Sequence, residues 1–206
     1  MAFLVCGEFG VYGGLQKRYL YVFGYLIGRY TSSRGKMDTK KFDGIVLMGP
    51  FGVGKSYLGR FLHHEKIGTY SELEPVLYKK FSDGGELDTE RASAFIRQYY
   101  FNTLSSSEIN MPIFESTGMV QRPLLLEVMK QYNLALVKVV VSKEVSLERV
   151  AKRNAVSHTA IEQNQVSEFY DNWMQNVAKL YKFSVEVDGS DVHSATELIK
   201  FCIQNK

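Results

Sequence analysis

The sequence has little cysteine, and long apolar runs are missing. Two cysteines, Cys6 and Cys202, stand among 206 residues, which is too few for a disulfide-stabilised scaffold or a four-cysteine zinc site. The apolar run Tyr19–Ile27 has nine residues, whereas a membrane-spanning helix needs about 20. The four histidines show no spacing that indicates a metal site. We therefore expect no transmembrane segment, and the basic pair at 17–18 without a following Ala-x-Ala does not fit a secretory signal.

The small excess of positive charge is confined to one end of the chain. The formal net charge is +3, but residues 1–36 hold five basic side chains and one acidic side chain. The rest of the chain is close to neutral. Nucleic-acid-binding domains usually present a basic surface, so a long nucleic-acid contact by residues 37–206 is disfavoured.

Residues 1–36 form a distinct N-terminal extension that is basic and aromatic. They contain eight of the 27 aromatic residues and seven of the 17 glycines. The extension could dock on the domain, bind a membrane surface or a partner, or lie upstream of a true start at Met37. Residues 31–36 are polar and are typical of a linker. We expect a domain over residues 37–206.

Strand and helix patterns alternate from Asp43 onward. Short apolar runs predict five strands, and segments with helical spacing separate them. Such alternation indicates an α/β fold, a three-layer sandwich with a five-stranded parallel sheet between helices. The predicted strands are 45–48, 67–70, 111–114, 134–141 and 183–187. The predicted helices are 56–63, 75–82, 87–104, 124–129, 145–155, 160–181 and 195–203, and we place the aromatic residues around Trp173 in the core.

A phosphate-binding loop is the most specific signal. Gly49-Pro-Phe-Gly-Val-Gly-Lys-Ser56 matches G-x-x-x-x-G-K-[ST] in full and lies between a predicted strand and a predicted helix, as this motif requires. Glycines let the backbone wrap a phosphate chain, Lys55 supplies a positive charge, and the Ser56 hydroxyl binds Mg²⁺. We expect ATP and Mg²⁺ as cofactors. The expected nucleotide-binding residues are Gly49, Pro50, Phe51, Gly52, Val53, Gly54, Lys55, Ser56 and Tyr57.

From about Phe42 to its C-terminus the chain resembles the small P-loop kinases of the adenylate-kinase and shikimate-kinase type. The resemblance implies the P-loop NTPase fold and transfer of the γ-phosphoryl group of ATP. The segment Tyr70-Ser-Glu-Leu-Glu74 stands where shikimate-kinase-like proteins carry an acid-x-acid pair. By this resemblance Glu72 receives the proton of the acceptor or supports Mg²⁺, and Glu74 holds acceptor hydroxyls. Surface glutamates at a helix start are the alternative.

The same resemblance assigns two further parts of the site. Glu115, in Pro112-Ile-Phe-Glu-Ser-Thr-Gly118, looks like the Walker B carboxylate that orders Mg²⁺, and Gly118 lies where the family faces the acceptor. The glycine-rich turn of shikimate kinases is not reproduced there, which argues against shikimate itself. A solvated glutamate at a strand end is the alternative for Glu115.

Arginines complete the expected site. Arg149 and Arg153 are four residues apart, so they share one helix face, and the resemblance places them on the ATP phosphates, where they stabilise the transferring phosphoryl group. We expect residues 154–166 as a possible lid and Arg97 as an acceptor-binding residue. For all three arginines the alternative is a solvated surface position.

The sequence thus favours a cytoplasmic small-molecule kinase that acts on a nucleoside, a nucleotide or a hydroxylated metabolite. The first alternative is an ATP-binding regulatory NTPase or ATPase. A guanine-specific GTPase is disfavoured because N-K-x-D is missing. The second alternative is a polynucleotide or toxin-type kinase, because binding one 5′ end requires few charges.

Overall fold

A five-stranded parallel sheet forms the centre of the computed structural model, which describes residues 42–83, 86–119, 121–154 and 161–205. Its strands are β1 (Gly44–Met48), β2 (Thr69–Tyr70), β5 (Pro112–Ser116), β6 (Leu134–Val140) and β7 (Val185–Asp188). They lie in the order β2-β5-β1-β6-β7 and pair in parallel throughout. The expected five-stranded parallel sheet is confirmed.

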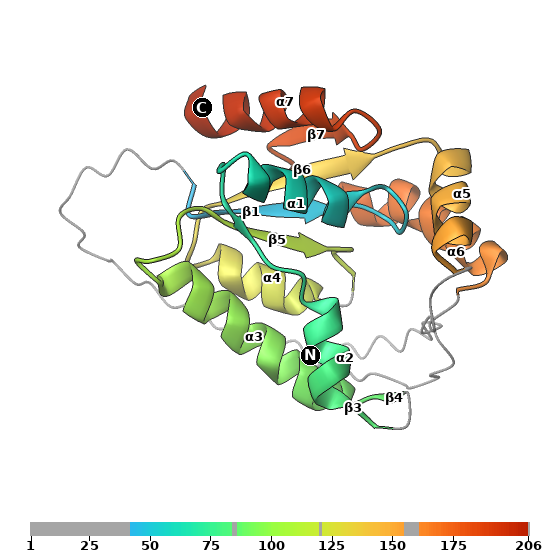
Figure 1. The fold of residues 1–206 in the computed structure, drawn as a ribbon, viewed down its shortest axis with the longest axis horizontal. Coiled ribbons are helices and arrows are strands. Elements are labelled where there is room, and N and C mark those ends of the chain that lie inside the picture. Colours follow the sequence, from blue (N-terminus) through green and yellow to red (C-terminus); the bar gives the residue numbers. More distant parts are fainter. Residues whose placement is uncertain (1–41, 84–85, 120, 155–160, 206) are drawn as a thin grey trace, which may run out of the picture.

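Helices cover both faces of this sheet and complete the three layers (Figure 1). The helices are α1 (Lys55–His64), α2 (Glu74–Phe81), α3 (Thr89–Ser105), α4 (Arg122–Met129), α5 (Lys143–Asn154), α6 (Gln163–Asn172) and α7 (Val192–Asn205). Among the described helices, none is both long and apolar enough to cross a bilayer.

The alternation of buried side chains along β1 explains the layers. Ile45 and Leu47 pack in a cluster with side chains of α1 and α7. Val46 and Met48 point the other way, into a cluster with side chains of α3, α4 and α6. Because successive strand residues face opposite sides, a strand buried on both faces is apolar at every position, as β1 is.

The structure also differs from the expected elements in two places. The helix expected over 160–181 is three pieces: α6, a π-helical turn at Trp173–Val177 and a 3₁₀ turn at Ala178–Leu180. A small antiparallel hairpin, β3 (Ser82–Asp83) with β4 (Glu86–Leu87), lies between α2 and α3. Two-residue strands are too short to produce an alternating pattern, so this hairpin could not be predicted from the sequence.

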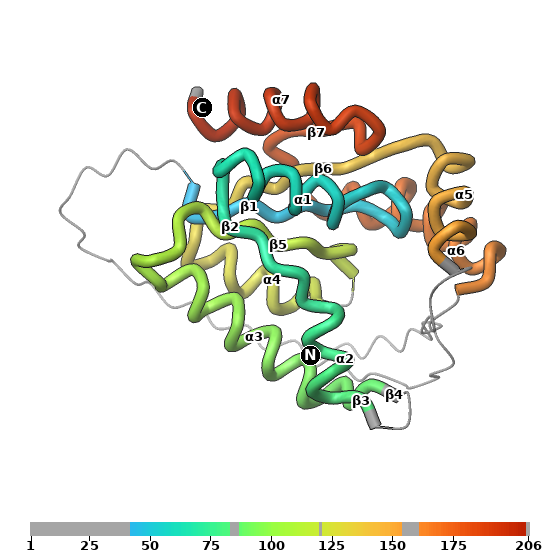
Figure 2. Tube along the Cα trace, in the orientation of Figure 1, coloured from blue at the N-terminus to red at the C-terminus, as the bar shows by residue number. Residues whose placement is uncertain are grey.

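The strand order places a topological switch point beside β1. The chain runs from β1 outward to β2 on one side, returns to β5, and then crosses to β6 and β7 on the other side (Figure 2). In open α/β sheets, ligands bind outside the carboxyl ends of the strands at such a point. The phosphate-loop sequence begins there, directly after β1. The extension 1–36 and Met37 lie outside the described residues.

Candidate active site

The loop after β1 depends on glycine at two positions. Gly52 and Gly54 have φ values of +74° and +96°, in the left-handed region that favours glycine. At Gly52 a Cβ atom would lie 2.4 Å from the backbone oxygen of Ser146. The glycines of the motif therefore serve both the turn of the loop and its close approach to α5.

Three neighbouring segments hold this loop in place. The Ser146 hydroxyl donates a hydrogen bond of 2.6 Å to the Phe51 carbonyl, and the Phe51 ring packs on Phe169 with centroids 4.5 Å apart. Gly189, just after β7, approaches so closely that a Cβ there would lie 1.9 Å from the Val53 oxygen. The loop conformation is thus set by α5, α6 and the turn after β7 together.

Lys55 begins α1 and its amine turns back toward the loop. Its Nζ donates to the carbonyls of Gly49 at 2.9 Å and Pro50 at 2.7 Å. Burial lowers the pKa of the Lys55 ammonium to about 8, with an opposing effect of the Glu115 charge and a further lowering by Arg153. A phosphate bound at the loop would raise the pKa of Lys55 again, because its negative charge would stabilise the ammonium.

Each carboxylate oxygen of Glu115, on β5, accepts a hydrogen bond from a hydroxyl group. Ser56 Oγ donates to Oε2 at 2.8 Å, and the Tyr70 hydroxyl donates to Oε1 at 2.9 Å. Burial, followed by the charge of Glu115, raises the pKa of Tyr70 well above its ordinary value, so its hydroxyl stays a donor at neutral pH. The structure thus brings the two expected metal ligands, Ser56 and Glu115, into direct contact.

A small cavity opens beside Glu115. Its volume is about 120 Å³, and its polar lining consists of Ser71, Glu74, Glu115 and Gln121. Gln121 Oε1 is buried and lacks a hydrogen-bond partner within the described part of the chain. The cavity therefore joins an expected metal ligand, an expected acceptor-binding glutamate and a free acceptor atom.

Two expected site residues lie in ion pairs and do not line this cavity. Glu72 pairs with Arg60 of α1 at 2.7 Å, with both side chains more than a third exposed. Arg97 of α3 binds Glu127 of α4, with Nε 3.2 Å from Oε2, and lies over the Phe101 ring. The role of Arg97 in binding the acceptor remains a prediction. So does the role of Glu72, which is expected to receive the proton of the acceptor or to support Mg²⁺.

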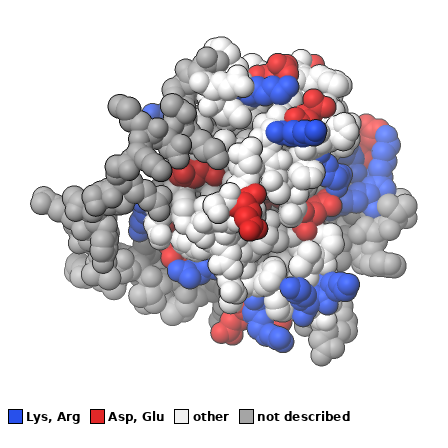
Figure 3. All heavy atoms as spheres, turned by 60° about the vertical axis from the view of Figure 1, so that its left-hand side comes forward, with Lys and Arg blue, Asp and Glu red and all other residues white. Residues whose placement is uncertain are grey.

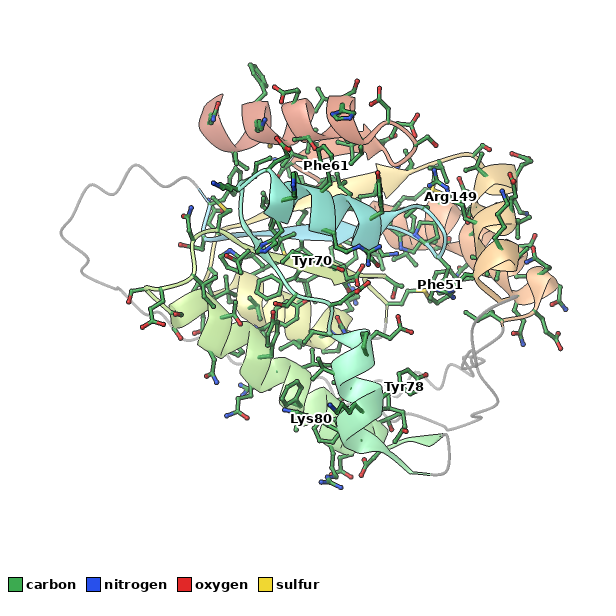
Figure 4. All side chains as sticks on the ribbon, in the orientation of Figure 1. Phe51, Phe61, Tyr70, Tyr78, Lys80 and Arg149 are labelled. Carbon is green, nitrogen blue, oxygen red and sulfur yellow. The ribbon has the colours of Figure 1, made fainter. Side chains whose placement is uncertain are left out.

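Arg149 lies at the phosphate loop (Figure 4). Its guanidinium donates to the carbonyls of Gly52 at 3.4 Å and Gly189 at 3.3 Å. Arg153, one turn further along α5, is near enough to affect the charge of Lys55. Both arginines thus stand on the face of α5 that the four-residue spacing predicted.

Gly118 has a role in packing. Its φ is +72°, and a Cβ there would lie 2.4 Å from the Met48 methyl carbon. Its carbonyl accepts a hydrogen bond from the Tyr181 hydroxyl. These contacts account for glycine at this position, and its expected contact with an acceptor remains a prediction.

The remaining expectations have different outcomes. Trp173 is completely buried, as expected, and its Nε1 donates to the Thr117 carbonyl at 2.7 Å. Tyr57, which was expected to bind the nucleotide, is 56% exposed, and that role remains a prediction. Residues 155–160 of the expected lid lie outside the described residues, and the lid's last residues belong to the first turn of α6, which begins at Gln163.

Sequence reasoning missed Tyr70, Ser146 and Gln121 as parts of the site. Tyr70 carried a usable signal, because it ends a strand at the same sheet edge as the phosphate loop. Ser146 and Gln121 carried none, since each is an ordinary polar residue near a helix start.

A depression larger than the cavity beside Glu115 lies elsewhere on the described surface. It is open, has a volume of about 670 Å³ and runs between α1 and α7, with Phe61, His193 and Phe201 in its lining. None of its lining residues belongs to the phosphate loop. Size alone therefore does not identify the candidate site; the chemistry of the residues at the end of β1 does.

Comparison with solved structures establishes the fold. A shikimate kinase from Acinetobacter baumannii in complex with shikimate superposes with a TM-score of 0.59 at 16% identity, covering 81% of this chain and 96% of that chain. The chain has the P-loop NTPase fold. A shikimate kinase from Bacteroides thetaiotaomicron gives 0.53 at 19% identity, covering 76% and 95%.

A third solved structure, a deoxyadenosine kinase from M. mycoides with bound dATP, gives 0.50 at 17% identity, covering 76% of this chain and 97% of that chain. The expected resemblance to small P-loop kinases is confirmed at the level of the fold. No family model and no curated protein matches the sequence.

Proposed function

We propose that the protein is an ATP-dependent phosphotransferase. It transfers the γ-phosphoryl group of ATP to a hydroxyl or phosphate of a small molecule such as a nucleoside, nucleotide or metabolite. The observation that carries this proposal is the direct contact of Ser56 with Glu115, next to a cavity that also contains Glu74. A nucleotide site and a place for an acceptor therefore adjoin.

The loop 49–56 binds the phosphates in this proposal. The N-terminus of α1 adds its partial positive charge. Two of the three Lys55 protons are directed at loop carbonyls, which leaves the third for a phosphate oxygen. Arg149 and Arg153 approach from α5 and stabilise the charge of the transferring phosphoryl group.

Mg²⁺ fits the donor set of Ser56 and Glu115. It prefers oxygen ligands and is usually held by one or two carboxylates plus phosphates and water. No cluster of three or more His, Cys, Asp or Glu suited to a metal occurs in the described ranges, and Mg²⁺ on a nucleotide does not require one. When bound, Mg²⁺ neutralises charge on the β- and γ-phosphates.

The acceptor binds in the cavity beside Glu115. Glu74 accepts hydrogen bonds from its hydroxyls, and Gln121 Oε1 offers a further acceptor atom. A carboxylate near the reacting hydroxyl is needed to receive its proton. Because Glu74 lines the cavity and Glu72 does not, Glu74 is the better placed of the pair for this task.

Surface charge is consistent with a small acceptor. On the face shown in Figure 3, basic and acidic side chains both occur, and the basic ones lie in separate groups with acidic side chains among them. The cytoplasmic location and the exclusion of nucleic acid remain predictions of the sequence.

The test is an ATP-consumption screen of the purified protein against nucleosides, nucleotides and hydroxylated metabolites. ADP release that depends on one acceptor, with a phosphorylated product, supports the kinase. Lys55→Met should abolish this turnover, and Lys152→Met, which changes an exposed lysine of α5, should not. ADP release that is the same without any acceptor indicates an ATPase and contradicts the proposal.

A further inference from the structure

We propose that Tyr70 is a positioning residue that holds the Glu115 carboxylate in the orientation needed for Mg²⁺ and nucleotide. This inference rests on the proposed function. The resemblance to known kinases assigns no such role to a tyrosine at the end of β2, and the sequence pattern singled out only the acids that follow it.

The geometry of the carboxylate is the first argument. Tyr70 and Ser56 approach it from different elements, β2 and α1, and each takes one oxygen, at 2.9 Å and 2.8 Å. Two donors on two oxygens fix the rotation of the carboxylate plane, which a single donor does not. A carboxylate oxygen has two lone pairs, so each oxygen keeps capacity for a metal or its water.

The rigidity of the tyrosine is the second argument. Tyr70 is 7% exposed, and its backbone pairs with Ile113 on β5, the strand that carries Glu115. Its ring lies beneath α1 (Figure 4). A hydroxyl on a buried ring between two fixed elements is well suited to orient another group.

Gly59 gives the third argument. Glycine in the middle of a helix is unfavourable relative to alanine, yet Gly59 lies in the middle of α1. A Cβ at Gly59 would lie 2.6 to 2.9 Å from three carbons of the Tyr70 ring. The helix thus carries a glycine at the position where the ring needs the space.

The role of Tyr70 becomes larger when metal binds. Ser56 would then share its oxygen between the metal and the Glu115 contact, whereas the Tyr70 hydroxyl would keep its hydrogen bond to Glu115. Loss of an orienting partner of a metal ligand typically costs about 10- to 100-fold in metal affinity or activity. We therefore expect a defect specific to the metal and not to the nucleotide.

The experiment compares Tyr70→Phe with Tyr170→Phe. Both changes remove one hydroxyl and keep the ring, and the Tyr170 hydroxyl donates to the Val141 carbonyl at 2.6 Å, on a different strand end. Calorimetry gives the dissociation constant of a non-hydrolysable ATP analogue for each protein, once in EDTA and once in excess Mg²⁺. The dissociation constant in EDTA divided by the dissociation constant in Mg²⁺ measures the coupling between metal and nucleotide.

In Tyr70→Phe the ratio should fall about 10-fold or more, while affinity in EDTA stays close to wild type. Tyr170→Phe should keep the wild-type ratio. Gly59→Ala, which keeps the hydroxyl but displaces the ring, should also lower the ratio. A wild-type ratio in Tyr70→Phe overturns the proposal, and so does an equal fall in Tyr170→Phe. If the wild-type protein fails to bind the analogue under either condition, the proposed function itself is wrong.

Discussion

Replacing Lys55 by methionine should change how the stability of the nucleotide-free protein depends on pH. The fold holds this ammonium in a buried position, where it donates to two loop carbonyls. Burial lowers its pKa from the ordinary 10.5 to about 8. The unfolded chain therefore binds this proton more tightly than the folded protein does.

The sign and size of the effect follow from this difference. Because the unfolded state holds more protons between about pH 8 and 10.5, the free energy of unfolding rises with pH through that window and is lowest below it. One pKa unit corresponds to about 1.36 kcal/mol, which gives about 3 kcal/mol for the lowering of the Lys55 pKa from 10.5 to about 8. Lys55 keeps some exposure to solvent, so we expect about 2 kcal/mol.

Urea unfolding between pH 7 and 10.5, in EDTA and without nucleotide, measures this effect. The difference between Lys55→Met and wild type cancels the titration of other groups. The variant should lose about 2 kcal/mol of stability relative to wild type on going from pH 7 to 10.5. Lys152→Met, at a side chain that is 74% exposed, is the control and should follow wild type. If the Lys55→Met and wild-type curves stay parallel, the reasoning about the buried ammonium is refuted.

Three further outcomes are expected. Gly189→Ala places a methyl group 1.9 Å from the Val53 oxygen, so urea unfolding should show a loss of about 1–3 kcal/mol; an unchanged midpoint would contradict the close approach. Trp173→Phe removes a hydrogen bond to a loop carbonyl and part of a buried ring, and should cost about 2 kcal/mol in the same assay. Once an acceptor is known, Glu74→Gln should lower kcat by about 100-fold or more and Glu72→Gln by less; the reverse order in steady-state kinetics would return the proton-accepting role to Glu72.

The parts of the fold that follow from local pattern were predicted well. β1 is apolar at every position and β6 at every position except Lys138, as strands covered on both faces are. The phosphate loop is recognisable because its glycines, Lys55 and Ser56 act within eight consecutive residues. Helix α3 was expected over 87–104 from its apolar stripe, which is a local feature, and its buried residues include Ala92, Ile96 and Tyr100.

Side-chain partners were not predictable in the same way. Arg97 was expected to meet an acceptor, but α4 brings Glu127 to it across 30 residues of chain. Ion-pair partners between helices depend on packing angles, which no local pattern contains. The helix expected over 160–181 was also changed by tertiary contacts that no local pattern contains. Its apolar spacing is helical, but a π-helical turn interrupts it at Trp173–Val177. There the buried tryptophan contacts the loop after β5.

The sequence by itself determined that a phosphate loop follows a buried strand, because motif, strand and helix are contiguous. Only the tertiary structure decided what faces that loop. The order β2-β5-β1 places β5 next to β1 and β2 next to β5. Ser56 therefore contacts Glu115, which is 59 residues away in the chain. Tyr70 contacts the other oxygen of the same carboxylate. A parallel sheet sets neighbours by strand order, not by distance along the chain, and for that reason the contact of Tyr70 with Glu115 could not be derived from the sequence.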